Sequence, residues 1–229
     1  MILRDKIVII TGASKGLGRA LSQAFTKEGS KLVMSARSDK EMRGFREEVG
    51  GLIVPADVSK EDDVRNLAEQ AVKKFGQIDI WINNAGIRVP HGPIEKLDMK
   101  RVHEMIEVNL FGTIYGSKAA VIQMKKQQSG VIINILSTSA LDGRAFSSAY
   151  AASKYAAAGF TKSLQKESEH ENILVIGVFP GGMKTNFFNE QMPEDFNNYM
   201  DPNYVAEKII KNLKEPAPAR ELIIKRQDK

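Results

Sequence analysis

The sequence predicts an α/β fold, in which one doubly wound parallel sheet of about seven strands is covered by helices on both faces. Two observations predict it. Short runs rich in β-branched residues alternate with longer amphipathic segments along the 229 residues. These runs are apolar throughout, which suits a parallel sheet with neither face open to water. No composition shift, internal repeat or linker divides the chain, so we expect one domain over residues 1–229.

The short apolar runs are the predicted strands. They are Ile7–Ile10, Lys31–Ser35, Leu52–Pro55, Ile78–Ile82, Val131–Leu136, Ile173–Phe179 and Leu222–Ile224. Helical patterns between them include Glu61–Phe75, Met99–Gln128 and Ala149–Glu169. Ser59, with Asp62 three residues on, is the expected N-cap of the first of these helices. Right-handed crossovers would gather the loops at the carboxyl ends of the strands.

Composition excludes several classes of protein. Hydrophobic residues form 42% and charged residues 27% of the chain, an ordinary globular mixture. The absence of cysteine excludes disulfide scaffolds and thiolate chemistry, and the three histidines lack metal-ligand spacing. A net charge of +5 without long basic blocks argues against nucleic acid. No run approaches the ~20 apolar residues of a membrane span, and the opening KIVIITG indicates a strand rather than a signal peptide, so we expect a cytoplasmic protein.

A glycine-rich turn, TGASKGLG, joins the first strand to a helix. Such glycines permit a tight turn and a close approach to a ligand, while the helix N-terminus offers free N–H groups to a pyrophosphate. By itself the turn is weak evidence, because it can be a plain strand-to-helix connection. The residues expected to hold a dinucleotide here are Gly12, Ser14, Lys15, Gly16, Leu17 and Gly18.

The end of the second strand bears on the choice of dinucleotide. An enzyme that prefers NAD usually has an acid there to bind the ribose 2′-hydroxyl, whereas a 2′-phosphate needs cationic neighbours. This chain has no acid at that position, and Arg37 and Ser38 follow the strand. Together with Lys15 they favour NADP(H) over NAD(H), unless both cations are only solvated surface charges. Asp57 and Val58, after the third strand, are expected at the adenine rim.

Further stretches extend the pattern: NNAG at 83–86, Asn109, Ser137 at the end of the fifth strand, and YAASK at 150–154. Their order and spacing resemble the short-chain dehydrogenase/reductase (SDR) family over residues 6 to 185. The resemblance implies a Rossmann fold and hydride transfer between a nicotinamide and a carbonyl or alcohol. It also implies a catalytic tetrad of Asn109, Ser137, Tyr150 and Lys154.

The chemistry of the tetrad follows from the spacing of Tyr150 and Lys154, which are four apart on one helix face. A nearby ammonium would lower the pKa of the phenol from about 10 toward working pH, so that it acts as general acid or base. Ser137 would donate to the substrate oxygen, with Ser139 as the alternative, and Asn109 would hold a water that relays protons. Singly, each residue is also explained by a surface contact, a strand-end cap or a helix kink.

The resemblance assigns further residues around the cofactor. It places Asn83, Ala85 and Gly86 in the cofactor wall and Asn84 as a brace of the central sheet. Tyr150 and Lys154 would lie at the nicotinamide ribose, and Thr185 would bond the carboxamide. The nicotinamide-binding loop comprises Pro180, Gly181, Met183 and Thr185.

Substrate recognition is expected from three segments: residues 87–91, residues 138–141 and a lid at 186–200. The apolar side chains of the lid would cover a hydrophobic carbonyl compound, although the segment is equally compatible with an amphipathic helix packed on the core. Arg88 and His91 would either contact an acidic substrate group or be solvated.

These observations predict an NADP(H)-dependent oxidoreductase that acts on a ketone, an aldehyde or a 3-oxoacyl compound, with Tyr150 as general acid and base. The alternatives are a 3-oxoacyl-ACP reductase proper, for which Lys125 and Lys126 are a thin docking patch, and a non-catalytic NADP(H)-binding sensor or scaffold. The long helices at 99–128 and 149–169 would pair two copies as a homodimer or within a homotetramer. The glycine-rich tail that often supports a tetramer is missing.

Overall fold

The structure is a computed structural model that describes residues 1–37 and 40–226. Its strands form one sheet in the order β3-β2-β1-β4-β5-β6-β7, and every neighbouring pair is parallel. The predicted doubly wound parallel sheet is therefore confirmed, and each predicted strand overlaps an observed one. The strands are β1 (Ile7–Thr11), β2 (Lys31–Ser35), β3 (Leu52–Ile53), β4 (Ile80–Asn83), β5 (Gly130–Ile135), β6 (Ile173–Pro180) and β7 (Glu221–Ile224).

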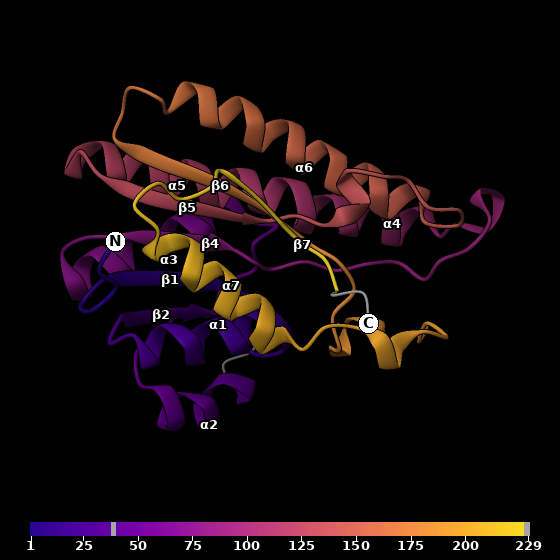
Figure 1. Cartoon of the computed structure of the whole chain (residues 1–229), viewed down its shortest axis with the longest axis horizontal. Coiled ribbons are helices and arrows are strands. Elements are labelled where there is room, and N and C mark those ends of the chain that lie inside the picture. Colours follow the sequence, from indigo (N-terminus) through magenta and orange to yellow (C-terminus); the bar gives the residue numbers. More distant parts are fainter. Residues whose placement is uncertain (38–39, 227–229) are drawn as a thin grey trace.

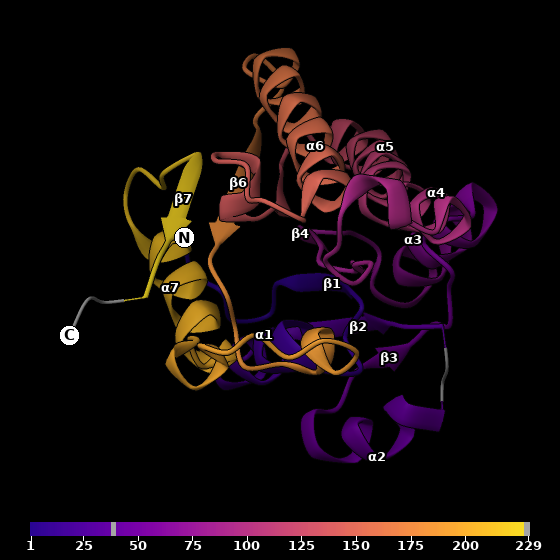
Figure 2. The same ribbon diagram turned by 90° about the vertical axis from the view of Figure 1, so that its right-hand side faces the viewer.

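Helices cover both faces of this sheet (Figures 1 and 2). Helices α1, α2 and α7 pack on one face, and α3, α5 and α6 pack on the other. The α-helices are α1 (Gly16–Lys27), α2 (Lys40–Val49), α3 (Glu61–Phe75), α4 (Met99–Ile106), α5 (Gly112–Gln127), α6 (Ser148–Glu167) and α7 (Pro202–Lys214). Along the described ranges, none of the helices combines the length and the apolar character that crossing a membrane requires.

The apolar strands explain this layering. Successive side chains of a strand point to opposite faces, so Val8 and Ile10 of β1 enter the core under α1 and α7. Ile7 and Ile9 enter the second core, under α3, α5 and α6. Because both faces are buried, a continuous apolar run is stable here, where an alternating run would bury polar groups.

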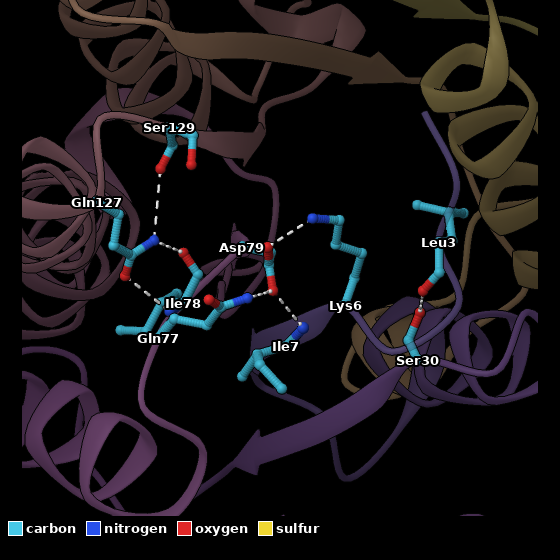
Figure 3. A network of polar contacts seen from close by, with 9 residues as sticks. All are labelled: Leu3, Lys6, Ile7, Ser30, Gln77, Ile78, Asp79, Gln127 and Ser129. Carbon is cyan, nitrogen blue, oxygen red and sulfur yellow. Dashed lines mark hydrogen bonds and ion pairs between the residues drawn. The ribbon is translucent and has the colours of Figure 1, made fainter.

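A polar network fastens the amino ends of β1 and β4 (Figure 3). The carboxylate of Asp79 accepts hydrogen bonds from Lys6 Nζ at 2.8 Å, from the Ile7 N–H at 2.8 Å and from Gln77 Nε2 at 2.9 Å. Beside it, the Gln127 amide bonds both the N–H and the carbonyl of Ile78. These hydrogen bonds fix the alignment of β1 and β4 at the amino ends of the strands. Ligands bind at the opposite, carboxyl ends in sheets of this kind.

Local structure departs from prediction at two helices. The N-cap of α3 is Lys60 and not Ser59, because the Ser59 hydroxyl donates to Asp57 Oδ1 at 2.7 Å. The helix predicted at Met99–Gln128 is interrupted by a π-helical turn, η2 (Glu107–Phe111), between α4 and α5. Such turns insert one extra residue into a helix and occur frequently at functional sites.

The segment 186–200 forms short 3-10 turns, η4 (Asn186–Phe188) and η5 (Phe196–Asn198). The alternative of an amphipathic α-helix is therefore wrong. Backbone hydrogen bonds from Lys184 N–H to Met200 O, and from Met200 N–H to Gly182 O, tie the two ends of the segment together. The segment is a closed loop after β6, and it lies at the carboxyl ends of the strands.

Candidate active site

A cavity of about 340 Å³ opens at the carboxyl ends of β1 and β4. These strands flank the point where the strand order reverses, which is where ligands bind in doubly wound sheets. Most of the residues expected at the cofactor line it. The lining consists of Gly12, Ser14, Lys15, Gly16, Leu17, Ala36, Arg37, Ala56, Asp57, Val58, Asn84, Ala85, Gly86, Ile87, Val108, Ile135, Leu136, Lys154, Pro180, Met183, Thr185, Asn186 and Phe187.

The glycine-rich turn fits a phosphate group. Gly12 has φ 65°, and a Cβ on it would lie 2.9 Å from Ala85 Cα, so only glycine allows this approach. A Cβ on Gly18 would lie 2.2 Å from the Gly12 carbonyl oxygen. Helix α1 begins at the cavity without a side-chain cap and without an acid in its first turn. Its positive end is therefore not neutralised by the chain itself, as a pyrophosphate site requires.

The far end of the cavity is cationic. Lys15 and Arg37 both line it and are exposed, and Asp57 is the one acid in the lining. One oxygen of Asp57 already accepts from the N–H and hydroxyl of Ser59, at 3.1 and 2.7 Å. Ser38 lies outside the described residues.

The two asparagines of NNAG have different positions, and the expected bracing of the central sheet by Asn84 is seen in its hydrogen bonds to Thr11 of β1. Asn83 is 4% exposed and lies behind the cavity wall, where its Oδ1 accepts from Trp81 Nε1 and its Nδ2 donates to Asn134 Oδ1. It braces β4 against β5. Asn84 lines the cavity, and its Nδ2 donates to the carbonyls of Thr11 and Gly12. The expected role in the cavity wall is therefore wrong for the Asn83 side chain, because its polar atoms are held by buried partners.

Helix α6 brings Tyr150 and Lys154 to the mouth of the cavity. Lys154 is 5% exposed, lines the cavity and donates from Nζ to the carbonyl oxygen of Ile135 at 3.0 Å. Tyr150 is half-buried one turn earlier, beside the hydroxyl of Ser137. The Ser137 hydroxyl acts on the Tyr150 phenol, whereas Ser139 donates its backbone N–H to Ser137 Oγ at 3.1 Å. The helix spacing and the strand end thus bring three expected residues together.

Burial is the main cause of the pKa shifts of Tyr150 and Lys154. Burial raises the pKa of Tyr150 to about 12, and the Ser137 hydroxyl and the Arg88 charge oppose the rise only in part. Burial lowers the pKa of Lys154 to about 8. The shift of Tyr150 is opposite to the expected lowering, because desolvation of the phenolate outweighs the favourable charges around it. At neutral pH the phenol is protonated and can donate a proton.

Asn109 lies in the π-helical turn and is 1% exposed. Its side chain accepts from the Ile87 N–H and donates to the Ile87 carbonyl, both at 2.9 Å, and it also donates to Ser153 Oγ at 3.1 Å. It therefore fixes the loop after β4 against α6. The water relay expected of Asn109 stays a prediction.

Comparison with known proteins identifies the chain. The family model described as short chain dehydrogenase matches residues 6–195. The chain belongs to the short-chain dehydrogenase family. An uncharacterized oxidoreductase of Staphylococcus aureus (strain MRSA252) is 33% identical over 218 residues, which cover 94% of each chain.

Solved structures resemble this short-chain dehydrogenase along nearly its whole length. The 3-ketoacyl-(acyl-carrier-protein) reductase of Brucella melitensis, in complex with NADH, has a TM-score of 0.90 and 29% identity, covering 97% of both chains. An alcohol dehydrogenase of the archaeon Thermococcus sibiricus, in complex with 5-hydroxy-NADP, has a TM-score of 0.86 and 27% identity, covering 98% of both chains.

Some expected cofactor residues of this short-chain dehydrogenase lie outside the cavity lining. Gly18 packs against the turn, and the N–H of Gly181 donates to the Ile224 carbonyl at 2.9 Å. Tyr150 stands beside the cavity rather than in its wall. The cavity is also lined by residues that were not among the expected cofactor contacts: Ala36, Ala56, Asn84, Ile87, Val108, Ile135, Leu136, Asn186 and Phe187. Ala36, Ala56 and Leu136 each precede an expected site residue at a strand end, a position that could have revealed them.

The segment 186–200 of this short-chain dehydrogenase packs over the side of the site that holds Tyr150. The ring of Phe187 meets that of Tyr150 edge to face, with centroids 5.9 Å apart, and Phe188 follows at 5.5 Å. Phe188 also contacts Tyr199 at 5.2 Å. From the loop after β4, Arg88 donates to the Gln191 carbonyl and to Gln191 Oε1. The loop after β4 and the segment after β6 therefore meet over the tyrosine.

Proposed function

We propose that this short-chain dehydrogenase is an NADP(H)-dependent carbonyl reductase, which transfers hydride between the nicotinamide and a ketone, aldehyde or 3-oxoacyl carbonyl. One observation carries the proposal. Tyr150, which is protonated at neutral pH, and the buried Lys154 stand one helical turn apart at the mouth of a cavity that begins at an uncapped helix N-terminus. That arrangement juxtaposes a proton donor with a cavity whose entrance offers free N–H groups to a pyrophosphate.

The residues of the chain divide the chemistry between them. When bound, the reduced dinucleotide supplies the hydride. Tyr150 donates a proton to the carbonyl oxygen, and Ser137 stabilises the charge that develops there by a hydrogen bond. Lys154 would hold the nicotinamide ribose of the bound dinucleotide, and Thr185 would hold the carboxamide; both residues line the cavity. In the alcohol-oxidising direction the alcohol proton passes to the Tyr150 oxygen after the phenol has given up its own proton.

The preference for NADP(H) is supported by charge. Lys15 and Arg37 line the end of the cavity beyond β2, and no acid ends that strand. Two cations there would favour a dianionic 2′-phosphate over a hydroxyl. Replacing Arg37 by leucine is therefore expected to lower kcat/KM for NADPH about tenfold and to leave that for NADH nearly constant.

The decisive experiment follows NADPH consumption against ketones, aldehydes, quinones and an acetoacetyl thioester. We expect Tyr150→Phe to abolish turnover and to retain NADPH binding, since only the proton donor is lost. The matched control is Tyr155→Phe on the same helix, where the tyrosine is exposed. Full turnover in Tyr150→Phe would contradict the assigned role. Tight NADPH binding without turnover of any carbonyl would favour the sensor or scaffold.

A second candidate is a 3-oxoacyl-ACP reductase, and the likeness to the Brucella melitensis reductase favours it. Such a reductase would have a much higher kcat/KM for an acyl-carrier-protein thioester than for the same acyl group on a small thiol. Pairing of two copies through α5 and α6 stays a prediction, which the exposed Phe111, Ile122 and Tyr155 support.

A further inference from the structure

Arg88 is held beside the proton donor. It follows β4 in the loop after NNAG, and its neighbours Ile87 and Val89 pack in one apolar cluster with Tyr150. The backbone of Ile87 is fixed in turn by both polar atoms of Asn109. The position of Arg88 is therefore set by the same contacts that position the catalytic tyrosine.

Among the described residues Arg88 forms no ion pair, and the carboxylate of Glu190, which pairs with Arg101, acts on its charge only from a distance. Its guanidinium donates to two uncharged oxygens of Gln191, at 3.2 and 3.1 Å, and lies 4.9 Å over the ring of Phe188. Two arginines nearby differ in this respect. Arg101 is paired with Glu190 at 2.6 Å and Arg226 with Asp195 at 2.9 Å. Arg88 is half-buried, and its burial lowers its pKa, so its charge is only partly solvated.

The partner of Arg88 marks a niche for an oxygen atom. Gln191 Oε1 accepts from the Arg88 guanidinium and also from the His91 N–H, at 2.6 Å. Two donors from one loop thus converge on one oxygen, while Gln191 Nε2 donates to the His91 carbonyl at 3.2 Å. A carboxylate oxygen in that place would accept both bonds, and its bond to the guanidinium would be charge-assisted and stronger than that of an amide. Positive charge extends around the niche, since Arg88 and Arg144 both act on His91.

We propose that Arg88 and the His91 N–H bind the carboxylate of a substrate, so that the preferred substrates are oxo acids, and that Gln191 occupies this niche when no acid is bound. The proposal rests on the carbonyl reductase function and names its substrate class. It assigns the specificity to the loop after β4, whereas the aromatic side chains of the segment 186–200 cover the rest of the substrate.

The test compares matched pairs that differ only in the carboxylate. The probes are acetoacetate with methyl acetoacetate, and pyruvate with methyl pyruvate, each reduced with NADPH. We expect the acid to exceed its ester in kcat/KM by about 10- to 150-fold for at least one pair, with the difference mostly in KM.

Variants then assign that ratio to the niche. Arg88→Met should bring the acid-to-ester ratio close to one, and Arg88→Lys should restore part of it. Gln191→Glu should also reduce the ratio, because its carboxylate would pair with Arg88, whereas a purely structural role for Gln191 would affect acid and ester alike. The matched control is Arg65→Met, which removes an exposed arginine of α3 and should keep the wild-type ratio.

The outcomes separate this inference from the proposed function. Esters reduced as well as the acids, or a ratio that survives in Arg88→Met, would overturn the carboxylate site and leave the reductase intact. Failure to reduce any carbonyl in the wider panel would overturn both. Thermal unfolding of each variant, compared with wild type, shows whether a lost ratio reflects lost folding.

Discussion

Lys154→Met is expected to abolish carbonyl reduction and yet to make the protein more stable at neutral pH. Burial lowers the pKa of Lys154 from 10.5 to about 8, which corresponds to roughly 3 kcal/mol of unfavourable free energy for the buried ammonium at pH 7. Methionine fills a similar volume without a charge. The substitution also removes the hydrogen bond to the Ile135 carbonyl, a loss of about 1–2 kcal/mol. The net gain in the free energy of unfolding at pH 7 is therefore about 1–2 kcal/mol.

The dependence on pH makes this prediction specific. The folded protein releases the proton of Lys154 near pH 8, whereas the unfolded chain keeps it to about pH 10.5. Between these values the unfolded state binds more protons, so the free energy of unfolding of the wild type rises with pH. Relative to Lys154→Met, it should rise by about 3 kcal/mol across this window. The variant, more stable at pH 7, should become the less stable protein above pH 10.

Urea denaturation, followed by far-UV circular dichroism at intervals from pH 7 to 10.5, measures both curves. The control is Lys162→Met on the same helix, where the lysine is exposed and paired with Glu221 at 3.4 Å. The difference in the free energy of unfolding between Lys162→Met and wild type should be small and should change little below pH 9. A stability difference between Lys154→Met and wild type that is constant with pH would refute the reasoning, because it would mean that burial does not penalise the ammonium.

Two further predictions concern folding and are tested by urea denaturation. Gly116→Ala should lower the free energy of unfolding by about 2–4 kcal/mol, because the new Cβ would lie 1.9 Å from Asn83 Oδ1. The control is Gly159→Ala, which should be neutral or slightly stabilising because nothing lies within 4 Å of its new Cβ. Equal effects of these two substitutions would contradict the steric argument. Asp79→Ala should lower the free energy of unfolding by about 3–5 kcal/mol, because the substitution leaves three donors of the strand-end network without their acceptor. A loss below about 1 kcal/mol would show that water replaces the carboxylate.

Local sequence determined the fold and most of the candidate site. Continuous apolar runs can be stable only where both faces of a strand are covered, so they predicted a parallel sheet. The glycine spacing of the first turn predicts a tight turn and a close approach to a ligand, and this pattern is visible without tertiary structure. Tyr150 and Lys154 share a helix face by spacing alone. Each of these features depends on residues close together in the chain.

Only the tertiary structure decided the features that depend on distant partners. Asn83 and Asn84 are adjacent and chemically identical, and their roles differ because Asn134 of β5 and Trp81 hold the first one behind the wall. The pKa of Tyr150 depends on how far packing excludes water, so the helix spacing of Tyr150 and Lys154 predicted the wrong direction for its shift. Gln191 meets Arg88 across about a hundred residues, and short-range patterns carry no information on which loops meet.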